Sequence, residues 1–121
     1  MGEELSVTVR REREAAIVEV TGDIDLTTVA ELRERLFALA DEGQSLVIDL
    51  NRVTFIDSTG LGVLIGTARR ADERGGSLHA VCSQPQPRKL LWMTGVDRRI
   101  PLSATVDEAL MLQATPRGTS G

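Results

Sequence analysis

Apolar and polar residues alternate at the start of the chain and give way to longer apolar runs further on. Residues 5–10 alternate with a period of two, which is typical of a strand buried on one face. Residues 16–20 form a second, more apolar strand, and the charged residues 11–14 between the two indicate a turn. A link this short predicts an antiparallel hairpin, and we expect Gly22 to end its second strand.

The remainder of the chain alternates between helical and strand-like patterns. Apolar residues at helical spacing predict helices that start near residues 28, 58, 88 and 105. Two pairs of residues have the spacing of capping boxes: Thr28 with Glu31, and Thr105 with Glu108. The strands between the helices are expected at residues 45–50, 77–82 and 100–103, and residues 51–56 are expected to connect a strand to the second helix.

These elements follow the order ββαβαβαβα, in which strands and helices alternate after an opening hairpin. Such an order predicts an α/β fold with a single mixed, mostly parallel sheet and helices packed on it. A chain of 121 residues is one domain by size. We assign residues 1–114 to this domain and expect residues 115–121 to form a flexible C-terminal tail, because they are polar and rich in Gly and Pro.

Charge and composition exclude several classes of function. A net charge of −4 and an aromatic content of 2% do not fit a nucleic-acid-binding protein, which needs a basic face and stacking platforms. No apolar run reaches the roughly 20 residues of a membrane-spanning helix. The single cysteine, Cys82, is expected to be a small buried side chain, and a cytoplasmic location is predicted.

The segment Asp57–Gly62 (Asp-Ser-Thr-Gly-Leu-Gly) lies where an apolar run changes to a helical pattern. Ser58 is therefore expected at the junction of a strand and a helix, with an accessible hydroxyl and unpaired backbone N–H groups nearby. Two interpretations remain open for Ser58: a helix cap, or an exposed site of modification.

The helix after Ser58 has an apolar stripe and a second stripe that begins with Gly62 and Gly66. Glycine costs a helix interior about 1 kcal/mol relative to alanine, so two on one stripe need a reason. One reason is close approach by a binding partner, and the other is packing against a neighbouring element of the same domain.

Catalytic and cofactor-binding interpretations of this segment fail on composition. A serine nucleophile needs a base, and the only histidine, His79, lies in a predicted strand. A dinucleotide loop would need a third glycine at position 65, which is Ile. One His and one Cys do not form a metal site. We therefore predict that the chain is not an enzyme and binds no cofactor of its own.

A phosphate on Ser58 would add about −1.5 to −2 charges at the start of a helix, where the dipole and free N–H groups favour anions. Asp57 would offset part of that gain by repulsion. The fold should tolerate the modification. A docking surface is not expected to tolerate the added charge, because a desolvated or like-charge mismatch there costs several kcal/mol.

The segments 46–50 and 53–64 closely resemble the STAS domains of bacterial anti-sigma-factor antagonists. Gly22-Asp23-Ile24-Asp25 and the Leu91–Val96 segment resemble two further motifs of this family. The resemblance extends from about residue 5 to residue 112 and implies a small sheet with four helices on one side.

The resemblance also implies partner switching. In this family the unphosphorylated antagonist binds an anti-sigma factor and thereby frees the sigma factor. The anti-sigma factor is also a serine kinase that uses its own ATP and Mg²⁺, and a serine phosphatase reverses the reaction. The serine of the motif matches Ser58, with Thr59 a less favoured acceptor. The residues expected at the partner surface are Asp23, Asp25, Asp57, Ser58, Thr59, Gly60, Gly62 and Gly66.

The alternative is a STAS protein that does not switch, such as a scaffold or an accessory subunit of a signalling or transport assembly. A monomer or weak dimer is expected in either case.

Overall fold

A computed structural model describes residues 4–114 of the chain, so the predicted tail at residues 115–121 lies outside the described residues. The predicted order of strands and helices is confirmed, and one short 3-10 helix, η1, is additional. The elements are β1 (Ser6–Glu12), β2 (Ala15–Ile24), α1 (Val29–Asp41), β3 (Ser45–Ile56), α2 (Ser58–Glu73), β4 (Leu78–Val81), α3 (Pro85–Met93), η1 (Val96–Arg98), β5 (Leu102–Ser103) and α4 (Val106–Ala114).

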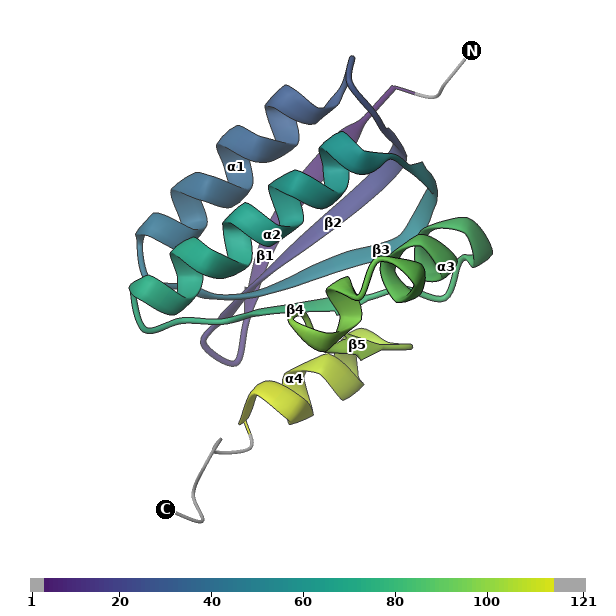
Figure 1. Ribbon diagram of the computed structural model, residues 1–121. Helices are drawn as coiled ribbons and strands as arrows, with labels where there is room; N and C mark the ends of the chain where they lie inside the picture. The colour runs from purple at the N-terminus through teal and green to yellow at the C-terminus, as the bar shows by residue number, and fades with distance from the viewer. Residues whose placement is uncertain (1–3, 115–121) are drawn as a thin grey trace.

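The strands form one five-stranded sheet in the order β1-β2-β3-β4-β5 (Figure 1). β1 pairs with β2 in the antiparallel sense, and every other neighbouring pair is parallel. The predicted mixed, mostly parallel sheet is therefore confirmed. Its parallel strands place their carboxyl ends at one edge, where β2 and β3 lead into α1 and α2.

The turn of the β1–β2 hairpin consists of two residues and not of the whole charged segment 11–14. Glu12 pairs with Ala15, and Arg13 and Glu14 between them have φ values of 53° and 69°. Two consecutive residues with positive φ are typical of a type I′ turn, whose twist matches that of the flanking strands. β1 consequently extends further than its alternating pattern predicted.

β2 does not end at Gly22, contrary to the sequence prediction. Gly22 lies inside the strand with a φ of 108°. A Cβ at this position would come within 2.6 Å of the carbonyl oxygen of Glu4. Glycine is required there because the backbone of the N-terminal segment passes directly over it.

Residues 51–56 belong to β3 and are not a connection, which corrects a second prediction. The pairing of β2 with β3 continues through two register shifts between Glu19 and Asp23. Such bulges place an unpaired residue in one strand and break the simple alternation by which strands are recognised in sequence. The two strands remain paired to their last residues, Ile24 and Ile56.

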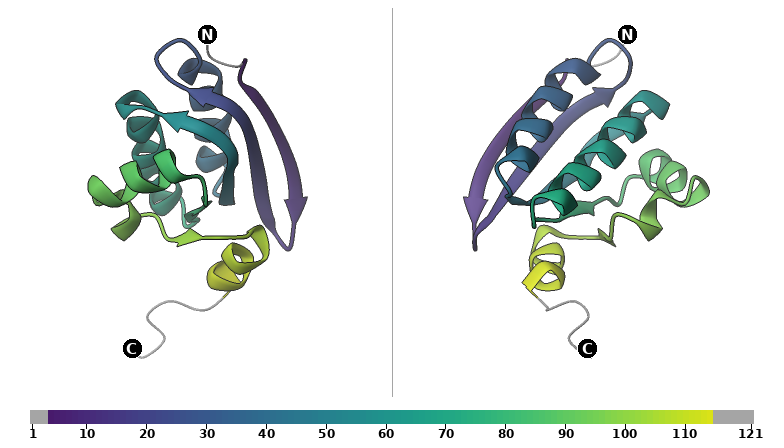
Figure 2. Two further views of the ribbon diagram at one scale, coloured as in Figure 1. Left: turned by 90° about the vertical axis from the view of Figure 1, so that its right-hand side faces the viewer. Right: turned by 60° about the vertical axis from the view of Figure 1, so that its left-hand side comes forward.

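Helices cover both faces of the sheet, which corrects the expectation of four helices on one side. Ala16 and Val18 of β2 belong to a large core cluster with residues of α1, α2 and α3. Ala15 and Ile17 instead belong to a small cluster with Ala109 and Leu110 of α4. Successive strand residues point to opposite faces, so α4 lies across the sheet from the other helices (Figure 2).

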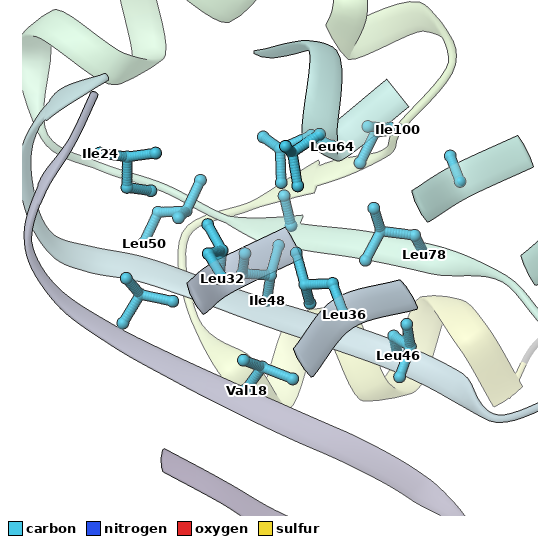
Figure 3. Close-up of a cluster of buried hydrophobic side chains, with 14 of the residues drawn as sticks. Val18, Ile24, Leu32, Leu36, Leu46, Ile48, Leu50, Leu64, Leu78 and Ile100 are labelled. Carbon is cyan, nitrogen blue, oxygen red and sulfur yellow. The ribbon is translucent and has the colours of Figure 1, made fainter. Parts of the chain in front are cut away.

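The main core lies between the sheet and the helices α1 and α2. Figure 3 shows Leu32 and Leu36 of α1 over Ile48 of β3, and all three side chains are fully buried. Cys82 is also fully buried in this cluster, as predicted for a small apolar side chain. No helix within residues 4–114 is long and apolar enough to cross a membrane.

α1 and α2 lie side by side, and Gly66 makes room for that contact. A Cβ on Gly66 would come within 3.1 Å of the ring of Phe37 on α1. Arg70 stacks over the same ring at 4.2 Å and pairs with Asp41 at 3.1 Å. The reason for this glycine is therefore packing within the domain, which was one of the two interpretations of the glycine stripe.

Candidate functional site

The start of α2 is capped by Asp57 and not by Ser58. Asp57 has extended backbone geometry, and its Oδ1 accepts hydrogen bonds from the N–H groups of Thr59 at 2.9 Å and Gly60 at 3.3 Å. Ser58 is the first residue of the helix. The cap interpretation of Ser58 is therefore wrong, since the carboxylate one residue earlier already performs that role.

The hydroxyl of Ser58 is available and that of Thr59 is not. Ser58 is exposed, and its hydroxyl makes no hydrogen bond with any residue of the described chain, 4–114. Thr59 is half-buried and donates its hydroxyl hydrogen to Oδ1 of Asp57. Of the two neighbouring hydroxyls, only the serine is presented to solvent without a partner.

The connection from β2 to α1 is held by its own side chains. Oδ1 of Asp25 accepts hydrogen bonds from the Thr27 N–H at 2.9 Å and the Thr27 hydroxyl at 2.7 Å. The Thr28 hydroxyl donates to the carbonyl of Asp23 at 2.8 Å and accepts from the Asp25 N–H at 3.0 Å. Thr28 consequently does not form the predicted capping box with Glu31, because its hydroxyl is turned back into the loop.

The second predicted capping box, at α4, forms one of its two expected bonds, and the Glu108 carboxylate binds one residue earlier than expected. The Glu108 N–H donates to the Thr105 hydroxyl at 3.2 Å, and the Glu108 carboxylate accepts from the backbone N–H of Ala104 at 2.9 Å.

Three acidic side chains, those of Asp23, Asp25 and Asp57, lie at this end of the molecule, and the charge of Asp25 acts on Asp57. The Asp57 N–H donates to the carbonyl of Ile24 at 3.1 Å, which fixes the β2–α1 connection beside the start of α2. The hydroxyl of Thr59 lowers the pKa of Asp57, and the charge of Asp25 opposes part of that shift. The hydroxyl of Thr27 lowers the pKa of Asp25. The carboxyl of Asp23 accepts a hydrogen bond from the Thr54 hydroxyl at 3.1 Å.

These lowered pKa values predict how stability depends on pH. A carboxyl with a lower pKa in the folded state stabilises the fold above its unfolded pKa, about 3.9, and loses that contribution as the pH falls through the folded value. We therefore expect the urea concentration at half-unfolding to decrease as the pH is lowered below about 4. The decrease should be less steep in Asp57→Asn. Asp72→Asn, an exposed change on α2, is the matched control and should behave as the wild type. Equal acid dependence in all three proteins would contradict this prediction.

The three glycines expected at the partner surface have three different environments. Gly62 is exposed, and a Cβ there would meet nothing within 4 Å. Gly66 packs on Phe37, as described above. Gly60 is buried, and a Cβ there would come within 2.6 Å of Ile56 and 2.7 Å of Ile24. Of the three, only Gly62 opens space at the surface beside Ser58, because Gly60 and Gly66 face the interior of the domain.

Two exposed apolar side chains, one in the β2–α1 connection and one near the end of β3, were missed in the sequence. Leu26 is 74% exposed at the tip of the β2–α1 connection, and Phe55 is 41% exposed near the end of β3, where it pairs with Asp23. Leu26 could have been recognised because it lies before Thr28, where the sequence predicts the helix to start. Phe55 could not, since the register shifts decide which face of the sheet it occupies.

Gln86 is a further residue that the sequence did not indicate. Its side-chain amide binds the backbone of Ile56 twice: Oε1 accepts from the N–H at 3.0 Å and Nε2 donates to the carbonyl at 3.0 Å. α3 thus holds the end of β3 immediately before Asp57 and Ser58.

The geometry also tests the catalytic alternatives. His79 is buried in β4 and pairs with Val47, whereas Ser58 follows Ile56 at the other end of β3. Ile56 lies nine positions after Val47, a rise of roughly 25–30 Å along the strand, so His79 cannot serve as a base for Ser58. Within residues 4–114, no three His, Cys, Asp or Glu side chains form a group suited to a metal ion.

This chain is similar to known proteins in both sequence and fold. The STAS domain family profile matches residues 6–109. The anti-sigma-B factor antagonist of Bacillus subtilis is 36% identical over 100 residues, which cover 83% of this chain and 92% of that protein. The anti-sigma-F factor antagonist RsfB of Mycobacterium tuberculosis is 32% identical over 107 residues, covering 88% of this chain and 87% of that protein.

A solved structure of a protein with the same kind of name has the same fold as this chain. The crystal structure of an anti-sigma factor antagonist from Mycobacterium paratuberculosis superimposes with a TM-score of 0.86 at 30% identity and covers 93% of this chain and 96% of that one. The match of the family profile over most of the chain, together with the shared fold, shows that this protein belongs to the STAS domain family.

Proposed function

We propose that this chain is an anti-sigma-factor antagonist controlled by phosphorylation of Ser58. In its unphosphorylated form it binds an anti-sigma factor that is also a serine kinase, and the sigma factor is released. Phosphorylation of Ser58 ends that binding, and a serine phosphatase restores it. ATP and Mg²⁺ belong to the kinase, and the cycle takes place in the cytoplasm. The names of the relatives support the partner class.

The observation that carries this proposal is the free hydroxyl of Ser58 at the first residue of α2. It lies on a corner whose backbone is fixed by Asp57 from within and by Gln86 from α3. Gly62 follows one turn later with open space in place of a side chain. A partner can therefore approach the hydroxyl closely, and the corner does not need to rearrange for phosphoryl transfer.

Phosphate on Ser58 is not stabilised by the helix start in the way the sequence suggested. The N–H groups of Thr59 and Gly60 are already occupied by Asp57. An added phosphate would instead stand beside the carboxylates of Asp57 and Asp25 without those donors. The proposal therefore relies on the partner surface to detect the charge, and the fold itself gains little from it.

The test is phosphorylation by the kinase-type anti-sigma factor of the same genome, followed by intact-mass measurement. The wild-type chain is expected to gain one phosphate. Ser58→Ala should gain none, because its acceptor is absent, whereas Thr59→Ala should still gain one. An unmodified wild-type chain, or a modified Ser58→Ala, would contradict the proposal.

A further inference from the structure

Trp92 and Met93 form an exposed apolar surface on α3. Their exposed fractions are 68% and 64%, although the same helix buries Pro87 and Leu91 on its opposite face. Trp92 is the only tryptophan of the chain. A large aromatic side chain left in solvent beside a methionine is typical of surfaces that bind another molecule.

Exposed cationic residues precede and follow this apolar pair in α3 and in η1, which is in contact with α3. Lys89 lies one helical turn before Trp92 and Met93, and Arg98 and Arg99 are exposed in the turn that follows Gly95. These three cations make no ion pair and no side-chain hydrogen bond within residues 4–114. Their charges are therefore available to an external partner.

The charge of this region is opposite in sign to that of the chain. Residues 85–100 contain four cationic residues and one acidic residue, a formal charge of +3, while the whole chain carries −4. The remaining residues thus carry a formal charge of −7. A partner that is drawn to this region by charge, rather than to the rest of the surface, is therefore anionic.

α3 holds the surface in a fixed orientation. Besides the two bonds from Gln86 to Ile56, Arg88 donates to the carbonyl of Cys82 at 3.0 Å and Gln84 donates to the carbonyl of Asn51 at 2.8 Å. The helix therefore cannot rotate to bury Trp92 without breaking these bonds. A surface ordered in advance loses less entropy when it binds.

We propose that the α3–η1 surface, defined as Lys89, Trp92, Met93, Arg98 and Arg99, binds an acidic segment of a partner protein that also presents apolar side chains. Trp92 and Met93 would receive the apolar side chains, and the three cations would pair with carboxylates around them. The surface does not include Ser58, so a charge at Ser58 should leave this binding intact. This inference does not depend on the function proposed for Ser58.

The fluorescence of Trp92 tests the proposal directly, because it reports on this surface alone. The probe is a synthetic helical peptide of Leu and Glu, and the matched control is the same peptide with Lys in place of Glu. We expect the Glu peptide to shift the emission to shorter wavelength, with an affinity that falls as salt is added. An equal response to both peptides would overturn the proposal, as would a response only to phosphatidylglycerol vesicles, which would indicate a membrane surface.

Charge-reversal variants locate the binding. The first variant combines Lys89→Glu, Arg98→Glu and Arg99→Glu and keeps Trp92 as the reporter. It should weaken binding of the Glu peptide about tenfold or more. The control combines Arg33→Glu, Arg52→Glu and Arg69→Glu, which are exposed changes of equal charge on α1, β3 and α2. Ser58→Asp should bind the peptide like the wild type. If the first variant binds no more weakly than the control, the assignment to α3–η1 is wrong.

Discussion

Replacing Ser58 by Asp is expected to weaken binding to the anti-sigma factor about 100-fold or more while changing the melting temperature by no more than about 3 °C. The fold should be insensitive because Ser58 is exposed and the cap belongs to Asp57. Binding should be sensitive because a partner that approaches over Gly62 excludes water from the new charge. Titration calorimetry and thermal unfolding on the same samples measure the two quantities.

Matched variants separate the effect of charge from the loss of the hydroxyl. Ser58→Ala removes the hydroxyl without adding charge and should bind within a few-fold of the wild type, since that hydroxyl makes no hydrogen bond within residues 4–114. A stable complex formed equally by Ser58→Ala and Ser58→Asp would favour the alternative of a STAS scaffold or accessory subunit that does not switch. A large fall in the melting temperature of Ser58→Asp would show that the residue is structural.

Gly60→Ala is expected to destabilise the domain by about 1–3 kcal/mol, although alanine normally favours a helix. Its Cβ would come within 2.6 Å of Cγ1 of Ile56 and 2.7 Å of Cγ2 of Ile24. Both isoleucines are fully buried, and the contacting atoms lie close to the backbone, so neither can move away cheaply. Urea unfolding at constant m-value is the appropriate measurement.

Gly62→Ala is the matched control for Gly60→Ala, since it makes the same change two residues later on the same helix. A Cβ at Gly62 meets nothing within 4 Å, so the change should stabilise the domain by about 0.5–1 kcal/mol through helix propensity alone. Equal effects of the two substitutions would show that contact with the isoleucines does not determine the need for Gly60. Gly62→Ala should also weaken partner binding if close approach over α2 is required.

The residues of the Asp57–Gly62 segment fall into two groups. Asp57 and Gly60 hold the start of α2 against β2 and β3, and Ser58 and Gly62 face outward. Thr59 belongs with the first group, because its hydroxyl is bound to Asp57. The eight residues expected at the partner surface remain a prediction, and we propose that its outward-facing part centres on Ser58 and Gly62, with the exposed Leu26 added.

Much of this architecture could be predicted from the sequence because burial leaves a local pattern. A period of two marked β1, helical spacing marked α1 and α2, and the alternation of elements predicted the mixed sheet. The junction at Ser58 was visible for the same reason, as an apolar run that changes to a helical period. The bulges near Asn51 were not visible, since they interrupt that pattern and concealed half of β3.

The sequence by itself therefore determined the class of fold, the order of its elements and the position of an exposed serine at a strand–helix junction. Only the tertiary structure decided that α4 covers the opposite face of the sheet, that Asp57 and not Ser58 caps α2, and that Gly60 and Gly66 face inward. The position of α4 and the inward-facing glycines depend on contacts between residues far apart in the chain, such as Gly60 with Ile24 and Gly66 with Phe37. The cap is a local contact, but either Asp57 or Ser58 has a side chain that can cap a helix, and the sequence does not say which one does. A local pattern records whether a residue is buried, but not which residue buries it.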